Sequence, residues 1–388
     1  MTALLRNARF RSYVYQVALV GGSCLLLVAF VLTTRHSLVA QGIATGFDFL
    51  QRSTGWDISF AVIDYTIRDP YWKVFLVGFL NTLLVGILGL VAATVFGTAI
   101  GMARVGQNPL LSFLGTVYVE VFRNIPLILQ GLFWYAVLTH LPPPRQAFTL
   151  GGWFYLSSRG VYAPFLALPT SGLLTLGGIV VGAVLAAVVA LQIPTVQAAR
   201  SLRRRVLSGI LLAAVAAVVA VIALNYDARV GLISVPQLQG LRFNGGMRLM
   251  PEFSALVVAI VFFGSAYIAE IVRGGLLSVN RGQIEAARSL GLSPFRVYRL
   301  VRIPLALRTI VPPLGNQFVW LMKATTVGIA FGFSDLFMVS STAINQSGQT
   351  IEILLIMMSG FLLINYLIAS AMNAVNRSIA LKGYETKR

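Results

Sequence analysis

The chain has 388 residues, of which 57% are hydrophobic and 11% charged, and its mean hydropathy is +0.82. These values lie outside the soluble range and predict a polytopic membrane protein. The 30 Lys and Arg against 12 Asp and Glu would suggest nucleic-acid binding in a soluble protein. We expect no nucleic acid here, because the distribution of the basic residues over the loops explains the excess.

The sequence carries few groups for redox, metal or phosphate chemistry. The single cysteine, Cys24, excludes an intrachain disulfide, and His36 and His140 lie far apart. No Gly-rich loop ends in Lys-Ser or Lys-Thr, the pattern that cradles phosphates. We therefore expect no cofactor on this chain. If ATP drives the protein, a separate subunit must bind ATP and Mg²⁺.

Eight apolar segments are long enough to cross a membrane as helices. The first, Tyr13 to Leu32, follows three arginines as a signal peptide does, but it is longer than a signal core and lacks a small-x-small cleavage site. We expect it to be retained. The others cover 75–100, 112–139, 172–192, 206–224, 254–275, 312–338 and 352–373. The predicted fold is an all-α polytopic membrane protein of about eight transmembrane helices.

Basic residues orient these spans, because Lys and Arg concentrate in cytoplasmic loops. Eight spans put both termini on one side, and a cytoplasmic placement brings about twenty of the thirty basic residues inside. In the outer segment 34–73, four basic residues are balanced by four aspartates, and many aromatic residues predict a segment resting on the membrane interface. We therefore predict that both termini are cytoplasmic.

Two further features concern packing. Gly97 and Gly101 have the four-residue spacing that permits close helix approach. Residues 142–252 form an insertion with a Pro-rich outer loop, two Ala- and Val-rich spans, and an outer loop rich in glycine and arginine. We expect the two spans to face lipid, and the arginines between 200 and 205 to fix their orientation from a short inner loop.

A polar segment, Gln283 to Pro304, is predicted to form two short helices joined at a corner. Gly291 suits the left-handed residue that closes the first, and Ser293 suits the cap of the second, which must end before Pro304. The second helix has arginines at 296, 299 and 302 on one side, and Val297, Tyr298, Leu300 and Val301 on the other. A solvated face and a partner-binding face both fit. A DNA-binding helix-turn-helix does not, because apolar spans close in on both sides.

Polar residues inside spans are costly and indicate function. Glu120, Arg123 and Gln130 lie in or beside the third span, and Glu270 and Arg273 at the inner end of the sixth. The pairs 120/123 and 270/273 have i, i+3 spacing, so ion pairing on one helix and lining of a transport path are both open interpretations.

Lys323 is the one lysine inside an apolar span, and the hydroxyls of Thr325 and Thr326 beside it suit a ligand or a freed backbone carbonyl. Asp335, twelve residues later, would be about three turns away on an unbroken helix, so each charge needs another partner or a substrate. The alternative for Lys323 is a side chain that extends to the membrane interface.

The polar segment resembles the EAA loop of ATP-binding-cassette importer permeases. The matching residues are Glu285, Ala286, Ala287, Gly291, Val301, Ile303 and Pro304, where Val and Ile are conservative departures from the pattern. Two stretches, 116–130 (TVYVEVFRNIPLILQ) and 266–326, are similar to the polar amino-acid branch of that family.

The resemblance implies a five-helix type I importer core, to which an N-terminal helix and a two-helix insertion are added. The implied divisions are 1–73, 74–141 as the first part of the core, 142–252 as the insertion, 253–373 as the second part with the loop 283–304, and 374–388 as a cytoplasmic tail. This enlarged form is similar to the larger permease of general L-amino-acid importers, which pairs with a second, related permease.

The resemblance also implies partners and roles. In that family the loop docks on a cytoplasmic ATPase dimer, here through Glu285, Ala286, Ala287, Gly291, Arg296, Arg299 and Pro304. A periplasmic binding protein delivers amino acids to permeases in the lipid of the bacterial inner membrane. A substrate with a carboxylate and an ammonium suits a path lined by Glu120, Arg123, Gln130, Glu270, Arg273, Lys323, Thr325 and Thr326.

Two other classes of function have different sequence signs. A secondary transporter or channel would use intramembrane acids for ion coupling, but the inverted repeat with broken helices that marks many transporters is absent. A membrane enzyme needs a set such as Ser-His-Asp, metal-ligand spacing or paired acids, and the sequence holds none. We predict an importer permease that is not an enzyme, with a secondary transporter or channel as the alternative.

Overall fold

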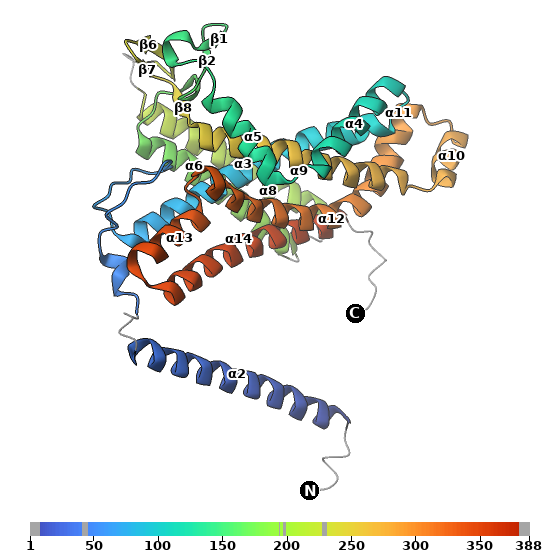
Figure 1. The fold of residues 1–388 in the computed structure, drawn as a ribbon. Helices are drawn as coiled ribbons and strands as arrows, with labels where there is room; N and C mark the ends of the chain where they lie inside the picture. The colour runs from blue at the N-terminus through green and yellow to red at the C-terminus, as the bar shows by residue number, and fades with distance from the viewer. Residues whose placement is uncertain (1–7, 41–45, 194, 197–198, 227–230, 380–388) are drawn as a thin grey trace.

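The chain is mainly helical, and the computed structural model describes residues 8–40, 46–193, 195–196, 199–226 and 231–379. Its α-helices (Figure 1) are α2 (Ala8–Ala40), α3 (Tyr71–Val105), α4 (Pro109–Asn124), α5 (Leu127–Thr139), α6 (Thr170–Gln192), α8 (Arg200–Leu224), α9 (Pro251–Leu277), α10 (Arg281–Ser289), α11 (Pro294–Val297), α12 (Ile303–Ala324), α13 (Leu336–Ser347) and α14 (Thr350–Ile379). Shorter helical turns are η1 (Asp48–Gln51), η2 (Pro144–Gln146), η3 (Tyr298–Arg302) and η4 (Thr325–Phe331).

Five of the described helices, α3, α6, α8, α9 and α14, are long and apolar enough to cross a membrane. Two bent pairs raise the count to seven if each pair is one span: α4 with α5, and the run from Pro294 to Phe331 with α13. Helix α2 carries a shorter apolar stretch, Val14–Phe30. The predicted spans are thus helical, but the third and the seventh are broken where the sequence predicted continuous helices.

Helices α3 and α9 pack against each other at the centre of the molecule (Figure 1). A Cβ atom on Gly97 would lie 2.7 Å from the carbonyl oxygen of Ser265, and one on Gly101 would lie 2.7 Å from that of Ala269. These separations are too short for any side chain, so the close approach requires glycine. The prediction from glycine spacing is confirmed.

The third span breaks between α4 and α5, which are bent by 101°. Pro126 disfavours helical geometry at the residue before it, and Ile125 is extended, with φ −90° and ψ 124°. The break frees backbone carbonyls. The buried Gln130 side chain donates from Nε2 to the carbonyls of Phe122 and Ile125, at 2.9 Å each. Gln130 therefore holds the break in place.

The seventh span breaks between η4 and α13, with a bend of 51°. Gly332 ends η4 with a φ of +83°. Asp335 then caps α13, where its Oδ1 accepts a hydrogen bond from the N–H of Met338 at 2.8 Å. The expectation of one continuous helix through Lys323 and Asp335 is therefore wrong, and the buried carboxylate serves the backbone of α13.

Two polar side chains of α3 support this second break from the neighbouring helix. The buried Asn81 donates from Nδ2 to the carbonyls of Ser334 and Phe60, at 2.7 Å each. Thr82 Oγ1 accepts from the N–H of Leu336 at 3.0 Å. The unwound backbone between η4 and α13 thus finds its partners within the protein.

Residues 46–70 reach into the protein, although the sequence predicted an outer segment resting on the membrane interface. Ser59 Oγ donates to the carbonyl of Gly332 at 2.7 Å. The ring of Phe60 stacks on Phe253 of α9, with centroids 5.0 Å apart. The second break explains the difference, because its unwound backbone offers polar partners that a continuous helix would not.

The second helix of the polar segment does not end at Pro304, contrary to prediction. Helix α11 continues through η3 into α12, and Pro304 lies in the first turn of α12. The turn η3 is a π-helix, in which the N–H of Ile303 bonds to the carbonyl of Tyr298, five residues back. This wider turn accommodates the proline ring, which in an α-helix would clash with the carbonyl four residues earlier.

The insertion contains β-structure that was not predicted. Strands β1 (Phe148–Leu150), β2 (Phe154–Ser157), β3 (Gly160–Ala163) and β8 (Met247–Leu249) form an antiparallel sheet in that order; β4 (Phe165–Leu166) pairs with β5 (Ile233–Ser234), and β6 (Gln237–Gln239) with β7 (Arg242–Asn244). The two loops of the insertion, predicted to lie outside, therefore fold together. We call residues 142–169 and 231–250 the β cap, which lies at the end of the molecule away from α10 and α11 (Figure 1).

The two spans of the insertion, α6 and α8, pack on each other and leave most of their surface open. Of their apolar windows, 6% in Ser171–Leu191 and none in Ser201–Leu224 is buried. The arginines at 203, 204 and 205 lie in the first turns of α8, not in an inner loop as predicted, because α8 already begins at Arg200.

We expect Gly97→Val to disrupt the packing of α3 on α9. The added side chain must displace the backbone at Ser265, which costs at least about 1–3 kcal/mol, so the purified protein should unfold roughly 5–10 °C below wild type. The matched control is Gly182→Val in α6, where a Cβ has nothing within 4 Å. The unfolding temperatures of both variants are measured in detergent by tryptophan fluorescence. Equal unfolding temperatures for the two variants would contradict the close packing of α3 on α9 at Gly97.

Candidate functional site

The first candidate site is the hook segment, residues 281–304, which joins α9 to α12. Asn280 caps α10 by accepting from the N–H two residues later at 2.9 Å. Gly291 ends α10 with a φ of +77°, its N–H bonds to the carbonyl of Arg288, and the next N–H bonds to that of Ala287. This pair of bonds is the helix ending that needs a left-handed residue, so the predicted corner at Gly291 is confirmed.

The hook segment leaves large apolar side chains exposed. Ala287 and Val297 are buried, and the two short helices contact each other. Ile284 and Tyr298 pack against the hydrophobic core. Leu290, Phe295 and Leu300 are 82%, 70% and 59% exposed. We expected Leu300 on the packed face, but the π turn of η3 changes the angular spacing of its residues and places Leu300 outside. Apolar side chains exposed together indicate a contact surface.

Two of the three arginines in the second half of the hook segment, at 296, 299 and 302, are free within the described chain. Arg296 and Arg299 are exposed, and their side chains make no ion pair or hydrogen bond within the part of the chain that the structure describes. Arg302 folds back, donating from Nε to the carbonyl of Leu276 at 3.3 Å. Ser293 is the N-cap residue of α11, as predicted, but its side chain makes no capping hydrogen bond.

The remaining hook residues that the sequence singled out lie around this surface. Glu285 and Ala286 are exposed, and Pro304 is partly covered at the start of α12. The end of α14 lies nearby, because Arg308 Nε of α12 donates to the carbonyl of Ile379 at 3.1 Å. The hook segment and the β cap lie at opposite ends of α9 (Figure 1).

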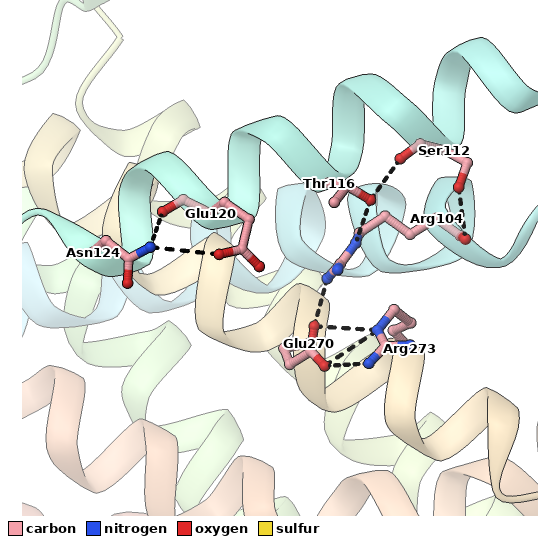
Figure 2. Close-up of polar contacts among 7 residues, drawn as sticks. All are labelled: Arg104, Ser112, Thr116, Glu120, Asn124, Glu270 and Arg273. Carbon is pink, nitrogen blue, oxygen red and sulfur yellow. Dashed lines mark hydrogen bonds and ion pairs between the residues drawn. The ribbon is translucent and has the colours of Figure 1, made fainter.

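A charge cluster joins α3, α4 and α9 close to the hook segment. Figure 2 shows Glu270 between two arginines: it accepts from Arg273 at 2.6 Å and from Arg104 at 2.5 Å. Arg104 Nε also contacts Thr116 Oγ1 of α4 at 3.4 Å. The predicted pairing of Glu270 with Arg273 is confirmed. The contact of Arg104 with Glu270 was not predicted, because a basic residue at the end of a span gives no sign of a partner 166 residues away in the sequence.

Glu120 and Arg123 do not form the ion pair that their spacing allows. Glu120 is exposed, and Asn124 donates to its backbone oxygen at 2.7 Å (Figure 2). Arg123 instead lies over the ring of Tyr267, with its Cζ 5.1 Å from the centroid. The Arg123 Nε is buried and has no hydrogen-bond partner among the described residues. A buried N–H without a hydrogen-bond partner destabilises the protein unless a ligand supplies the acceptor. A carboxylate is the strongest such acceptor.

Aromatic residues connect Arg123 with α12. The ring of Trp320 stacks on Phe263 and Tyr267 of α9, at centroid distances of 5.2 and 6.3 Å. Lys323 follows Trp320 by three residues and so lies on the same face of α12. It is exposed and forms no ion pair with the described residues. We call these five residues the Arg123 cluster. Tyr267 and Trp320 were missed, because an aromatic residue in an apolar span carries no distinguishing signal.

The other polar residues proposed for the path bond to nearby backbone. Thr325 Oγ1 donates to the carbonyl of Met322 at 3.0 Å, and Thr326 Oγ1 to that of Lys323 at 2.9 Å. Both hydroxyls therefore satisfy carbonyls where α12 ends, which is one of the two roles expected for them. Gln130 does the same at the first break.

The second part of the chain matches a known protein family. The family described as "Binding-protein-dependent transport system inner membrane component" matches residues 251–381. This range holds α9, the hook segment, the broken seventh span and α14.

Relatives match nearly the whole chain. It is 40% identical over 382 residues to the putative amino-acid ABC transporter permease protein YhdX of Escherichia coli (strain K12), covering 97% of this chain and 95% of the relative. It is 38% identical over 386 residues to the general L-amino acid transport system permease protein AapQ of Rhizobium johnstonii, covering 97% and 94%. It is 34% identical over 416 residues to the glutamate/glutamine/aspartate/asparagine transport system permease protein BztB of Rhodobacter capsulatus, covering 98% and 96%.

These relatives share one class of function, and their similarity includes the insertion as well as the hook segment. A subunit of this class transports and does not catalyse, and it works with ATPase and permease partners. The exposed hook segment and the apolar helices fit such a subunit. The chain belongs to the permeases of amino-acid ABC transporters, as a multi-pass membrane protein.

Proposed function

We propose that the chain forms one half of the path through which an ATP-driven importer takes up L-amino acids. In this proposal a second, related permease forms the other half, and an ATPase dimer binds ATP and Mg²⁺. A periplasmic binding protein delivers the amino acid. The complex lies in the inner membrane of a bacterium with both termini of this chain in the cytoplasm, and the open faces of α6 and α8 meet lipid.

The observation that carries the proposal is the surface of the hook segment. Leu290 and Phe295 are exposed apolar side chains, and Arg296 and Arg299 beside them are free within the described chain. A groove on the ATPase that buries the two apolar residues and offers acids to the arginines would match this surface. Glu285, Ala286 and Pro304 lie in the same segment.

The hook segment is positioned to transmit movement. Helix α11 runs through η3 into α12 without a loop, so a displacement of the hook segment moves α12 as a lever. Trp320 and Lys323 lie near the far end of α12. Closure of the ATPase dimer on ATP would therefore change the geometry of the Arg123 cluster and shift the two permeases from inward- to outward-open.

For the substrate we propose the Arg123 cluster as a contact site. The carboxylate of an amino acid would accept from Arg123 Nε, whose partner is missing in the described chain, and would attract Lys323. The ammonium would lie on the aromatic rings of Tyr267 and Trp320 or near the exposed Glu120. Gln130, Thr325 and Thr326 would shape the path by holding its breaks, and Glu270 with Arg273 would line its inner end.

The proposal is tested by reconstitution. The chain, a related permease, the ATPase and an amino-acid-binding protein are assembled in proteoliposomes, and uptake of labelled amino acids is measured. Uptake should require ATP and every component. Uptake that continues without the ATPase would contradict an ATP-driven importer and favour a secondary transporter.

We expect Gly291→Val to loosen the ATPase without unfolding the membrane part. A Cβ on Gly291 meets nothing within 4 Å, so the effect comes from forcing a β-branched residue to a φ of +77°. Gly291→Asn is the matched control, because asparagine adopts this conformation more readily. Co-purification of the ATPase should fall roughly tenfold for the valine variant and little for the asparagine variant. Full retention by the valine variant would mean that the corner is not needed.

We expect Lys323→Ala to reduce uptake while the complex stays assembled. Loss of a charged hydrogen bond to the carboxylate is worth about 1.5–3 kcal/mol, so uptake with saturating binding protein should fall by about tenfold or more. Lys73→Ala is the control, because Lys73 pairs with Asp69 at the outer start of α3. Unchanged uptake by Lys323→Ala would assign Lys323 to the membrane interface.

A further inference from the structure

The β cap carries a positive charge that nothing within it balances. Arg145, Arg159, Arg242 and Arg248 are all exposed, and none of them forms an ion pair with a described residue. The cap residues 142–169 and 231–250 include no Asp or Glu. The neighbouring outer segment 46–70 differs, because its arginines are accompanied by aspartates.

Three of these arginines lie beside one hollow. Arg145 and Arg159 line it together with Ser158 and Leu241, and its volume is about 430 Å³. Arg248 Nε donates to the carbonyl of Arg159 at 2.9 Å, which places it beside the same hollow. Arg242 follows Leu241 directly in the chain. Arg145, Arg159 and Arg248 therefore lie beside one hollow, with Arg242 on the adjoining strand β7, and we call these four residues the arginine patch.

An unbalanced patch of this kind is unexpected on its side of the membrane. Short loops on the side opposite the cytoplasm are normally poor in Lys and Arg, and topology thus gives no reason for these arginines. Like charges held together also repel one another. A covering acidic surface would remove this repulsion.

The surroundings of the arginine patch have the composition of a contact surface. Phe148, Trp153 and Leu241 are 58%, 54% and 61% exposed on strands and turns of the same cap. Exposed aromatic and apolar side chains next to arginine are enriched in protein–protein interfaces, where lysine is depleted. The described cap contains arginine and no lysine.

The β cap is also tied to the central helix. Strand β8 ends at Leu249, and α9 begins two residues later at Pro251. Strand β8 pairs with β3, so the sheet and α9 are continuous. A protein bound on the cap would therefore act directly on the helix that carries Tyr267 and Glu270.

We propose that the arginine patch is the docking surface for an acidic face of the amino-acid-binding protein. The inference rests on the proposed function, which supplies a soluble protein on this side of the membrane. Charge attraction over the patch would speed the encounter and orient the bound protein above the path.

The test reverses charge without removing a structural contact. The side chains of Arg159 and Arg242 make no hydrogen bond within the described chain, so the double variant Arg159→Glu with Arg242→Glu should fold normally. The assembled complex is placed in phosphatidylcholine nanodiscs, and the amino-acid-binding proteins of the source organism are titrated onto it individually. We expect the dissociation constant to rise about tenfold or more at ~50 mM salt, mainly through slower association, and the difference to shrink near ~0.5 M salt.

The matched control is Arg52→Glu with Arg68→Glu, two exposed arginines of the outer segment, which should keep wild-type affinity. Equal affinity of the cap variant and wild type would overturn the docking proposal and leave the importer function intact. The titrations are repeated in nanodiscs that contain anionic lipid. A difference in affinity between the cap variant and wild type that appears only there would assign the arginine patch to lipid headgroups and would also overturn the docking proposal. Failure of every binding protein to bind the wild-type complex would overturn the importer proposal itself.

Discussion

Backbone groups that leave a helix inside a membrane must find partners within the protein, because lipid offers none. This constraint shapes the two broken spans. Gln130 closes the first break, and Asn81, Thr82 and Asp335 close the second. An unpaired backbone group costs several kcal/mol in hydrocarbon, so each of these side chains is worth more here than on a soluble surface. The breaks in turn fix the positions of Arg123, in the last turn of α4, and Lys323, in the last turn of α12.

The polar residues of the spans therefore fall into two groups. The side chains of Gln130 and Thr325 donate hydrogen bonds to nearby backbone carbonyls and so stabilise the fold. Arg123 and Lys323 have no such partner among the described residues, although an unpaired cation is costly in the same surroundings. A site that keeps cations unpaired gains most from an anionic substrate. This contrast, more than the presence of charge, distinguishes the Arg123 cluster from the structural polar residues.

The sequence predicted the helices, the corner at Gly291 and the close approach at Gly97, because each depends on a local property of one residue type. It failed where distant segments decide the outcome. The second break depends on Asn81, more than 250 residues away from Ser334, and the contact of Arg104 with Glu270 spans 166 residues. The continuation of the helix through Pro304 was missed because the prediction expected the residue before the proline to leave helical geometry, whereas Ile303 is helical, with φ −61° and ψ −51°.

Helix α9 connects the β cap with the hook segment, the two surfaces proposed to bind partners. It starts at the β cap, packs on α3 through glycine contacts too close for other residues, and carries Tyr267 and Glu270. Close-packed helices move as rigid bodies, because their contacts allow no gradual deformation. In the proposed function, a movement of the β cap would therefore reach the Arg123 cluster along α9, and a movement of the hook segment would reach it along α12. The cluster lies where these two helices stack, at Tyr267 and Trp320, so it is the place where signals from both sides of the membrane would meet.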